Sequence, residues 1–519
     1  MTELSYTLTD IQNRSIEQMS RMNSCILALS PGTGKTLTVL HYVKHYLLKD
    51  NKDRCLFFIP KSARAAFEKE MKTRIEEPYL LITAGKSISY SDMVKHRYIF
   101  IENTLIHKYI SDLVSLVNNN PCHLIIDEAH SLQNPKSVFS TAAWEVRCYC
   151  KRVIAMTATP LMNSIEGLFN LCHFVYPRAF QSWFRFRARY CITKENTIRM
   201  KNKMGATIQR KFIEIVGYQN MQELNDILDK LIIKGCIYYN VNFEFLDCPL
   251  DACSEKAYRF ASNGLFDVLY HPEKAKARAK LKKAAGNNTG DEAKDFGSRL
   301  HDLQRVVDGC DSSVADSTFI SNKMKLLIDK TKQIMDNNES VLVYFEYKDS
   351  LEMAERILLD SQSEIGFNKI YRLTGEEKEE LRAKIESNLG LKEIVLCSQA
   401  ASQSRNLQRA NNLIVFNTCF SIGRFIQVTG RICRTDTTYD HQNIIVLSVK
   451  DTIDDYKVTL FKDHLSLISK LLGKDNTGVL TDCEYLDIDR SNMKELKNNL
   501  LWRRGIHNGT KQKQLLVGK

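Results

Sequence analysis

The sequence of 519 residues has no long hydrophobic run. No apolar stretch reaches the ~18 residues that are needed to span a bilayer. The polar start MTELSYTLTD also lacks the basic-then-apolar layout of a secretory signal. These absences argue against a membrane protein and against a secreted one, so we expect a soluble protein that stays inside a cell.

Regular cysteine spacing is also missing. The 15 cysteines are scattered, odd in number and never spaced Cys-x-x-Cys, and the close pair Cys148 and Cys150 has no further partner nearby. A disulfide framework or a structural zinc site needs closer and more regular spacing than this. We therefore interpret the cysteines as reduced thiols of the core, and we expect no zinc site.

The composition and the length indicate a globular protein of several domains. Hydrophobic residues make up 44% and charged residues 26% of the chain, which is the balance of a soluble fold. Because domains typically contain ~100 to 200 residues, a chain of 519 residues predicts two to four of them. The formal charge of +12 favours a polyanionic partner.

Two parts of the chain alternate short apolar runs with helix-like segments. The runs SCILALS, RCLFFIPKS, CHLIIDEAH and KRVIAMTATP come early, and SVLVYFEYK and NLIVFNT follow later. This alternation is typical of parallel βαβ units, so we predict an α/β protein with two lobes, each a parallel sheet flanked by helices. The predicted domains are lobe 1 (residues 1–180), a mostly helical linker that loses regular strands (181–320), lobe 2 (321–470) and a basic C-terminal extension (471–519).

The linker contains a strongly basic segment, EKAKARAKLKKAAGNN. We predict that Lys276, Arg278 and Lys280 share one helix with neighbouring lysines and that a loop follows. Such a helix is either a solvated surface or a patch that contacts nucleic-acid phosphates, and both interpretations stay open.

A glycine-rich turn, SPGTGKT, follows the first apolar run. In such a turn backbone N–H groups converge on an anion at the start of a helix, and glycines permit the close approach. Lys35 would reach the β and γ phosphates of a nucleotide, and the Thr36 hydroxyl would bind Mg²⁺. Leu29 stands where the strict pattern has glycine, so an ordinary strand-to-helix turn is the alternative. The candidate nucleotide-binding residues of the turn are Pro31, Gly32, Thr33, Gly34, Lys35 and Thr36.

Another apolar run, LIIDEAH, ends in the adjacent carboxylates Asp127 and Glu128. Open α/β sheets bind ligands at the carboxyl ends of their strands, which is where these side chains are expected. Asp127 is the candidate ligand of Mg²⁺, and Glu128 is the candidate that polarises the attacking water in phosphoryl transfer. Two exposed carboxylates at the end of a strand are the alternative.

The chain resembles the superfamily-2 helicases, and within them the Swi/Snf-type ATPases, through a long stretch that begins at IIDEAHSLQNPKSVF and ends at FVYPRAF. This stretch opens with the Asp-Glu-Ala-His box of motif II. The further matching residues are Gln133, Asn134, Ser137, Thr157, Thr159, Pro160, Leu161 and Asn163. The resemblance implies two tandem RecA-like lobes, the use of ATP and Mg²⁺, and DNA as the partner.

The same resemblance implies roles for other residues of lobe 1. LTDIQNRSIEQM is similar to the adenine-reading segment of the family, with Gln12 as the candidate for the base edge. FFIPKSARAAFEKEM is similar to the family's second motif. The implied DNA contacts are Lys61, Ser62 and Asn163, and the implied coupling residues are Thr157 and Thr159.

In lobe 2 the resemblance is sharpest at QVTGRICR. Gln427, Arg431 and Arg434 are spaced i, i+4 and i+7, so a helix would present them on one face. The two guanidinium groups would act as arginine fingers toward a γ-phosphate that lobe 1 holds. The segment CSQAASQSRNLQRAN keeps Asn406 but has Ser402 where the family has glycine, and both residues are implied DNA contacts.

These features predict an ATP-driven translocase on duplex or branched DNA that acts without sequence preference. A strand-separating helicase and an ATP-gated DNA-binding protein with little motor activity are the alternatives, and the altered glycines around Ser402 favour the binding protein. No bromodomain, chromodomain or zinc module is evident, and the linker resembles those of phage-type and fork-remodelling relatives. We therefore expect a compact phage-like or virus-like member in the cytoplasm of a host cell.

Overall fold

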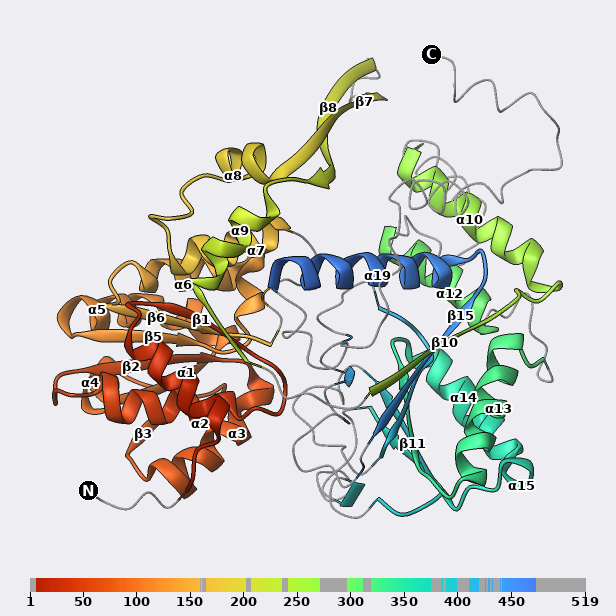
Figure 1. Ribbon diagram of the computed structural model, residues 1–519, viewed down its shortest axis with the longest axis horizontal. Helices are drawn as coiled ribbons and strands as arrows, with labels where there is room; N and C mark the ends of the chain where they lie inside the picture. The colour runs from red at the N-terminus through yellow and green to blue at the C-terminus, as the bar shows by residue number, and fades with distance from the viewer. Residues whose placement is uncertain are drawn as a thin grey trace. The chain divides into compact units, whose positions relative to one another are not determined.

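The computed structural model describes most of the chain, and Figure 1 colours it along the sequence. The described residues are 6–158, 160, 165–201, 207–235, 241–270, 296–310, 319–374, 384–385, 389–398, 410–419, 425, 428–429, 432, 439 and 441–472. The backbone alone is described for 196–201, 207–212, 214, 263–270, 296–299 and 463–472. Two compact units form, and the first boundary between them falls between Tyr239 and Asn240.

Unit 1 is built on a seven-stranded sheet with the order β3-β4-β2-β5-β6-β1-β9, in which every pairing is parallel. Its strands are β1 (Cys25–Leu29), β2 (Arg54–Ile59), β3 (Tyr79–Ile82), β4 (Tyr98–Glu102), β5 (Cys122–Ile126), β6 (Arg152–Met156) and β9 (Ile232–Gly235). Strands β1, β4 and β5 are buried at every position. Such strands are mostly apolar because helices cover both faces of a parallel sheet, and Glu102 of β4 and His123 of β5 are the buried exceptions.

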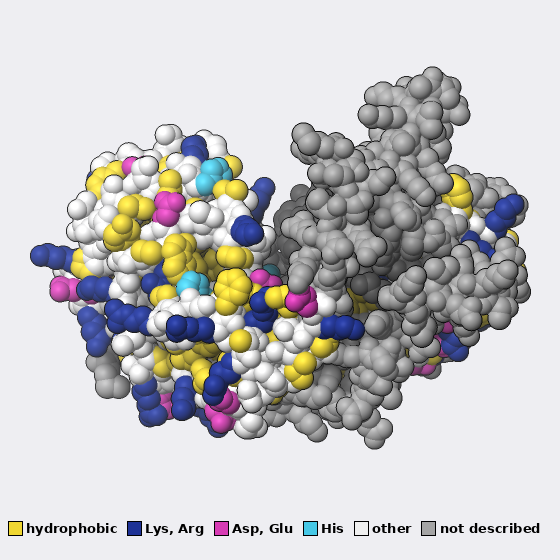
Figure 2. Space-filling view, turned by 90° about the horizontal axis from the view of Figure 1, so that it is seen from above, with side chains coloured by type: hydrophobic (Ala, Val, Ile, Leu, Met, Phe, Trp, Pro, Cys, Tyr) yellow, Lys and Arg dark blue, Asp and Glu magenta, His cyan; other side chains and the backbone are white. Residues whose placement is uncertain are grey.

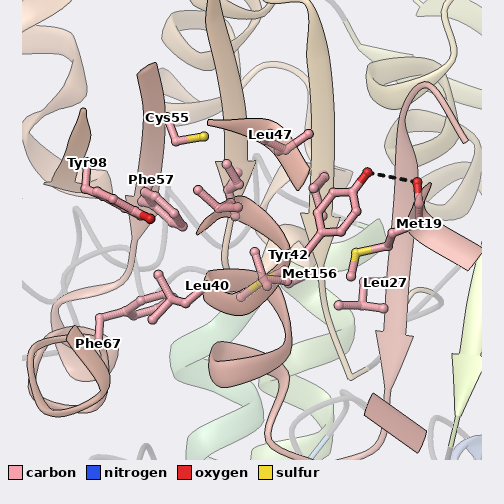
Figure 3. Close-up of a cluster of buried hydrophobic side chains, with 14 of the residues drawn as sticks. Met19, Leu27, Leu40, Tyr42, Leu47, Cys55, Phe57, Phe67, Tyr98 and Met156 are labelled. Carbon is pink, nitrogen blue, oxygen red and sulfur yellow. Dashed lines mark hydrogen bonds between the residues drawn. The ribbon is translucent and has the colours of Figure 1, made fainter. Parts of the chain in front are cut away.

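The helices of unit 1 pack an apolar stripe onto this sheet. They are α1 (Asp10–Ser20), α2 (Lys35–Tyr42), α3 (Arg64–Glu70), α4 (Tyr90–Lys95), α5 (Ile110–Asn119), α6 (Val138–Arg147), α7 (Ile165–Val175), α8 (Trp183–Tyr190) and α9 (Met221–Asp229). In the core of Figure 3, Phe57 of β2 and Phe67 of α3 meet at a centroid distance of 6.0 Å, and the Tyr42 hydroxyl donates to the Met19 carbonyl at 3.0 Å. This hydrogen bond satisfies the one polar atom that Tyr42 brings into the core.

Unit 2 has a six-stranded parallel sheet with the order β10-β15-β14-β11-β13-β12. Its strands are β10 (Val241–Cys248), β11 (Val341–Phe345), β12 (Lys369–Leu373), β13 (Glu393–Ser398), β14 (Asn412–Val415) and β15 (Gln442–Val449). The helices described with it are α10 (Ser254–Tyr270), α12 (Phe296–Asp308), α13 (Asn322–Asp336), α14 (Lys348–Asp360), α15 (Gln362–Ile365) and α19 (Ile453–Leu472). The two parallel sheets with flanking helices confirm the predicted fold of two RecA-like lobes.

A buried cluster of charged side chains, here called the Lys323 cluster, joins the helices of unit 2. Lys323 Nζ at the start of α13 lies 2.9 Å from Asp308 Oδ1 of α12 and 2.6 Å from Asp454 Oδ2 of α19, and all three side chains are at most 1% exposed. Asp308 Oδ2 also accepts hydrogen bonds from Ser350 and Asn417. Burial opposes the charge of Lys323, but the two carboxylates outweigh it and raise the lysine pKa.

The expectation that residues 181–320 lose regular strands is wrong. An antiparallel hairpin, β7 (Cys191–Lys201) and β8 (Thr207–Tyr218), follows α8, while β9 joins the sheet of unit 1 and β10 joins that of unit 2. The hairpin strands mix polar and apolar residues, and β9 is only four residues long. Neither the hairpin nor β9 therefore matches the apolar runs from which the other strands were predicted. Helices α8, α9, α10 and α12 lie in the same region. No helix among the described residues is long and apolar enough to cross a membrane.

Candidate active site

The glycine-rich turn joins β1 to α2. After the buried strand β1, Gly32 and Gly34 take left-handed conformations with φ of 84° and 76°, and α2 begins at Lys35. The Thr33 hydroxyl donates to the Ser30 carbonyl at 2.8 Å, which closes the turn on itself. The N–H groups at the start of α2, together with the partial positive charge of the helix, make this turn suitable for a phosphate group.

Lys35 supplies the positive charge beside the turn. Its Nζ donates to the carbonyl oxygens of Leu29 at 2.8 Å and of Ser30 at 3.2 Å. The ammonium group is therefore held over the end of β1, next to the left-handed glycines. Thr36 is half-buried in the first turn of α2, and Pro31 is half-buried in the loop before it.

Gln12 of α1 braces the same turn. Its Oε1 accepts from the Thr9 N–H at 2.9 Å, and its Nε2 donates to the Thr33 carbonyl at 3.1 Å. The side chain is 5% exposed. A Cβ atom on Gly34 would lie 2.3 Å from Nε2, so glycine is required there both by the backbone and by this neighbour. The role of Gln12 toward an adenine edge stays a prediction.

The acidic pair follows β5. The Asp127 N–H donates to the Phe58 carbonyl of β2 at 2.9 Å, and the side chain is buried. Glu128 has a left-handed backbone with φ of 49° and ψ of 48°, and its Oε2 lies 3.1 Å from Nδ1 of His130. A left-handed conformation is unfavourable for a glutamate and such strain is concentrated at functional sites.

Electrostatics distinguish Asp127 from an ordinary surface carboxylate. Burial raises the pKa of Asp127 to about 7, the neighbouring Glu128 adds to the rise, and Lys35 opposes it. The influence of Lys35 on Asp127 means that the phosphate turn and the acidic pair share one electrostatic site. A buried carboxylate in this state gains from a nearby cation, because positive charge restores its ionised form.

The topology of the sheet explains why these residues meet. Strands β1, β6 and β5 are neighbours, so their carboxyl ends lie side by side. Thr157 directly follows β6, is fully buried, and donates its N–H to the Leu27 carbonyl of β1 at 3.1 Å. Lys35, Thr157 and Asp127 thus come from three adjacent strand ends, which is the usual ligand position of such a sheet.

Gln133 connects this edge to the chain that follows Thr157. It lies in the short 3-10 helix η5 (Ala129–Gln133), which starts next to Glu128. Its Nε2 donates to the Pro160 carbonyl at 2.9 Å, and its own carbonyl accepts from Asn170 of α7 at 2.9 Å. Gln133, which the sequence analysis used only as a motif match, therefore joins the segment that follows the acidic pair to Pro160 and to α7 through direct hydrogen bonds.

A basic segment follows β2, the strand next to β5. Lys61 is exposed and Ser62 half-buried in the 3-10 helix η2 (Lys61–Ala63). Arg64 at the start of α3 points its Nη1 to within 3.6 Å of Oε1 of Glu102, which ends β4 and is 3% exposed. Sequence analysis missed Arg64 and Glu102, although Arg64 stands three residues after Lys61 and Glu102 directly follows the apolar residues 98–101.

Several predicted site residues lie outside the described residues. They are Thr159, Asn163, Lys276, Arg278, Lys280, Ser402, Asn406, Gln427, Arg431 and Arg434. Their roles stay predictions.

Comparison with protein families extends this picture. Residues 12–284 match the SNF2-related domain. The chain belongs to the SNF2-related family. Residues 322–436 match the helicase conserved C-terminal domain, so the Swi/Snf-type membership that the motifs predicted is confirmed. As an SNF2-related protein with both domains, the chain is a helicase-type enzyme that hydrolyses ATP.

Similar proteins span bacteria and eukaryotes. The uncharacterized ATP-dependent helicase YqhH of Bacillus subtilis is 22% identical over 489 residues, which are 90% of this chain and 79% of that protein. Chromodomain-helicase-DNA-binding protein 1 of Homo sapiens is 22% identical over 477 residues, which are 85% of this chain but only 26% of the human protein. The solved Sulfolobus solfataricus SWI2/SNF2 ATPase core in complex with dsDNA is 19% identical, with a TM-score of 0.39 over 95% of this chain and 97% of that one.

Proposed function

We propose that this SNF2-related ATPase couples ATP hydrolysis to movement on, or remodelling of, duplex or branched DNA without reading its sequence. One observation carries the proposal: the acidic pair after β5 and the basic segment after β2 occupy neighbouring strand ends, joined by the hydrogen bond from Asp127 N–H to the Phe58 carbonyl. A structural change at the acidic pair on ATP binding could therefore be transmitted through one hydrogen bond to β2 and to the basic segment that follows it.

The residues divide the ATPase chemistry among them. The N–H groups at the start of α2 and Lys35 would bind the β and γ phosphates. Thr36 and Asp127 offer oxygen ligands of the kind that Mg²⁺ prefers, and a bound Mg²⁺ neutralises charge on the phosphates. Glu128, aimed by its left-handed backbone, would orient the attacking water.

Contacts to DNA would use the backbone phosphates. Lys61, Ser62 and Arg64 lie in one short segment, and Glu102 holds Arg64 in place. Phosphate contacts carry no sequence information and weaken with salt. Figure 2 shows Lys and Arg side chains along the edge of unit 1 on the face in view, and the human relative is by name a DNA-binding helicase.

The finer assignments belong to the same proposal. Arg431 and Arg434, with Gln427, would complete the hydrolysis site from the helicase C-terminal domain, and Ser402 and Asn406 would contact DNA. The resemblance of the linker to phage-type relatives supports a role in handling a phage or viral genome in the cytoplasm of a host cell. The basic helix around Lys276 would add phosphate contacts.

The deciding experiment measures ATP hydrolysis with no DNA, single strands, duplex and a four-way junction. A translocase is stimulated by its preferred track, and equal rates under all four conditions would refute the proposal in favour of an ATP-gated binder. Release of a labelled strand from a tailed duplex would instead identify a strand-separating helicase.

A pair of variants tests the assigned chemistry. Lys35→Ala should lose both tight ATP binding and hydrolysis, whereas Glu128→Gln should bind ATP like the parent and fail to hydrolyse it. Glu145→Gln is the matched control, because Glu145 is an exposed glutamate on α6 of the same unit. Hydrolysis by Glu128→Gln at the level of Glu145→Gln would show that the water is activated elsewhere.

A further inference from the structure

Helix α8 and the hairpin β7–β8 form an arm, residues 183–218, on unit 1. An aromatic cluster fixes its base: Phe169 of α7 meets Phe186 at a centroid distance of 5.2 Å and Trp183 at 5.5 Å, and Phe186 meets Tyr190 at 4.9 Å. These contacts bury apolar area and attach α8 firmly to α7. Figure 1 shows the hairpin, in yellow, extending from α8 away from the sheet of unit 1.

A salt bridge completes the base of the arm. Arg189 Nε donates to Glu223 of α9 at 2.6 Å, Arg189 Nη2 donates to the second carboxylate oxygen, and the Tyr190 hydroxyl donates to the same glutamate at 2.8 Å. Two parallel hydrogen bonds between a guanidinium and a carboxylate fix orientation as well as distance. The hairpin therefore starts from a defined direction.

The hairpin itself contributes little to a core. Its strands of 11 and 12 residues pair from Cys191 opposite Tyr218 to Lys201 opposite Thr207. Even near the base, Ile192, Ile213 and Val216 remain 46%, 48% and 38% exposed. An isolated two-stranded ribbon is only marginally stable in water, so a long exposed one needs a reason other than packing.

Charge indicates what the arm would contact. Helix α8 has three arginines and no acidic residue, and Arg189 is the one that Glu223 neutralises. The two strands of the hairpin have five basic and two acidic residues in their sequences. The basic residues are Lys194, Arg199, Lys201, Arg210 and Lys211. Such an excess of positive charge on a projecting element attracts a polyanion.

The exposed ring of Phe184 indicates which kind of polyanion the arm would bind. This side chain of α8 is 72% exposed, and the Arg187 guanidinium lies 5.5 Å from the centre of its ring. Exposed aromatic rings beside arginines are platforms on which unpaired bases stack. Paired bases inside a duplex have no free face to offer, so the ring favours an unpaired strand over a blunt duplex.

We propose that the arm is a second nucleic-acid contact that binds an unpaired strand, with the basic hairpin on its phosphates and Phe184 stacked on a base. The proposal rests on the DNA function proposed above and adds a substrate feature to it: branched DNA with a single-stranded portion. None of the arm residues belongs to the nucleotide site, so the arm acts on substrate choice rather than on ATP chemistry.

The test compares two DNA probes of identical duplex sequence, one blunt and one with an unpaired tail. Phe184→Ala should weaken binding of the tailed probe about 5- to 150-fold, since stacking contributes ~1–3 kcal/mol per base, and leave the blunt probe unchanged. Phe260→Ala is the matched control, because Phe260 on α10 is similarly exposed, at 75%. It should bind both probes like the parent.

A second variant tests the phosphate contacts without changing the aromatic ring. Replacing Lys201, Arg210 and Lys211 by glutamine should flatten the slope of log K against log salt for the tailed probe by up to ~0.7 per lost contact. ATP hydrolysis without DNA should equal that of the parent in every variant, which confirms the fold.

The outcomes separate the two proposals. If the parent protein binds none of the DNA probes and no DNA stimulates its ATP hydrolysis, the DNA function is refuted. A parent that DNA stimulates, with tailed-probe affinity and salt slope unchanged in both arm variants, would refute the arm proposal alone.

Discussion

Substitution of Gly34 by alanine tests whether the phosphate turn is built as a unit with α1. Gly34 has a φ of 76°, and the added Cβ atom would lie 2.3 Å from Nε2 of Gln12. Gln12 cannot swing away freely, because it is buried and its amide is hydrogen-bonded to Thr33 and Thr9. Alanine therefore forces either the glutamine or the turn out of its observed position.

The expected magnitude has two parts. A left-handed alanine costs about 1–2 kcal/mol relative to glycine. Loss of the buried hydrogen bond from Gln12 to the Thr33 carbonyl costs a further ~1–3 kcal/mol. The two costs add to at least about 2 kcal/mol, which the variant would have to overcome to hold the turn in its observed conformation. ATP should therefore bind at least about 30-fold more weakly.

Fluorescent ATP analogues can measure this affinity directly. Gly85→Ala is the matched control, because Gly85 has a φ of 88° with nothing within 4 Å of an added Cβ atom. It should reduce the free energy of unfolding by about 1–2 kcal/mol and leave ATP binding unchanged. Adding Gln12→Ala to Gly34→Ala removes the collision, so the two changes should combine less than additively. ATP binding by Gly34→Ala within threefold of the parent would refute the reasoning.

Three further predictions concern other parts of the chain. Arg434→Ala should bind ATP like the parent and hydrolyse it ~10³-fold more slowly; DNA-stimulated turnover near the parent level would exclude an arginine finger. Lys323→Met should lower the free energy of unfolding by about 3–5 kcal/mol, because two buried carboxylates lose their cation, whereas the exposed Lys332→Met should cost under ~1 kcal/mol; equal losses in denaturant titrations would contradict this. Burial lowers the pKa of His123 from 6.5 to about 4, against the raising influence of Asp53, so the folded state binds fewer protons and stability falls as the pH drops from 6.5 to 4. His123→Gln should flatten that fall by up to ~1.4 kcal/mol per pH unit, and an unchanged slope would exclude His123 as its source.

The parts of the fold that the sequence predicted are those with strong local signals. Strands β1, β2, β5 and β6 correspond to the apolar runs that contain Cys25, Cys55, Cys122 and Val153, because strands that are covered on both faces are mostly apolar. The hairpin β7–β8 mixes polar and apolar residues and carries no such signal. Its strands are defined by their mutual hydrogen bonds, which leave no trace in hydropathy.

In the candidate site, too, some residues were predicted from sequence motifs and others were not. The turn that ends in Lys35 and the pair Asp127 and Glu128 were predicted from short motifs, since the chemistry of phosphate and Mg²⁺ restricts the residue types. The support for these residues was not predictable. Contacts such as Gln12 to Thr33 and Arg64 to Glu102 join segments that meet only through the strand order of the sheet.

Buried charges near the strand ends are paired with opposite charges in unit 2, whereas two carboxylates are adjacent in unit 1. This difference supports unit 1 as the place where the chemistry occurs. In unit 2, residues after β11, β14 and β15 join the Lys323 cluster, in which Lys323 faces Asp308 and Asp454. The buried Lys457 adds a second cation and donates to Gln304, which donates in turn to both carboxylates. Such a balanced network stabilises one arrangement of helices. In unit 1, burial and the neighbouring Glu128 raise the pKa of Asp127, and the opposing influences of Lys35, of a backbone hydrogen bond and of His130 do not restore its usual value. A nearby cation favours the ionised form of such a carboxylate, so a Mg²⁺ ion that arrives with a nucleotide would stabilise Asp127 at the strand ends of unit 1.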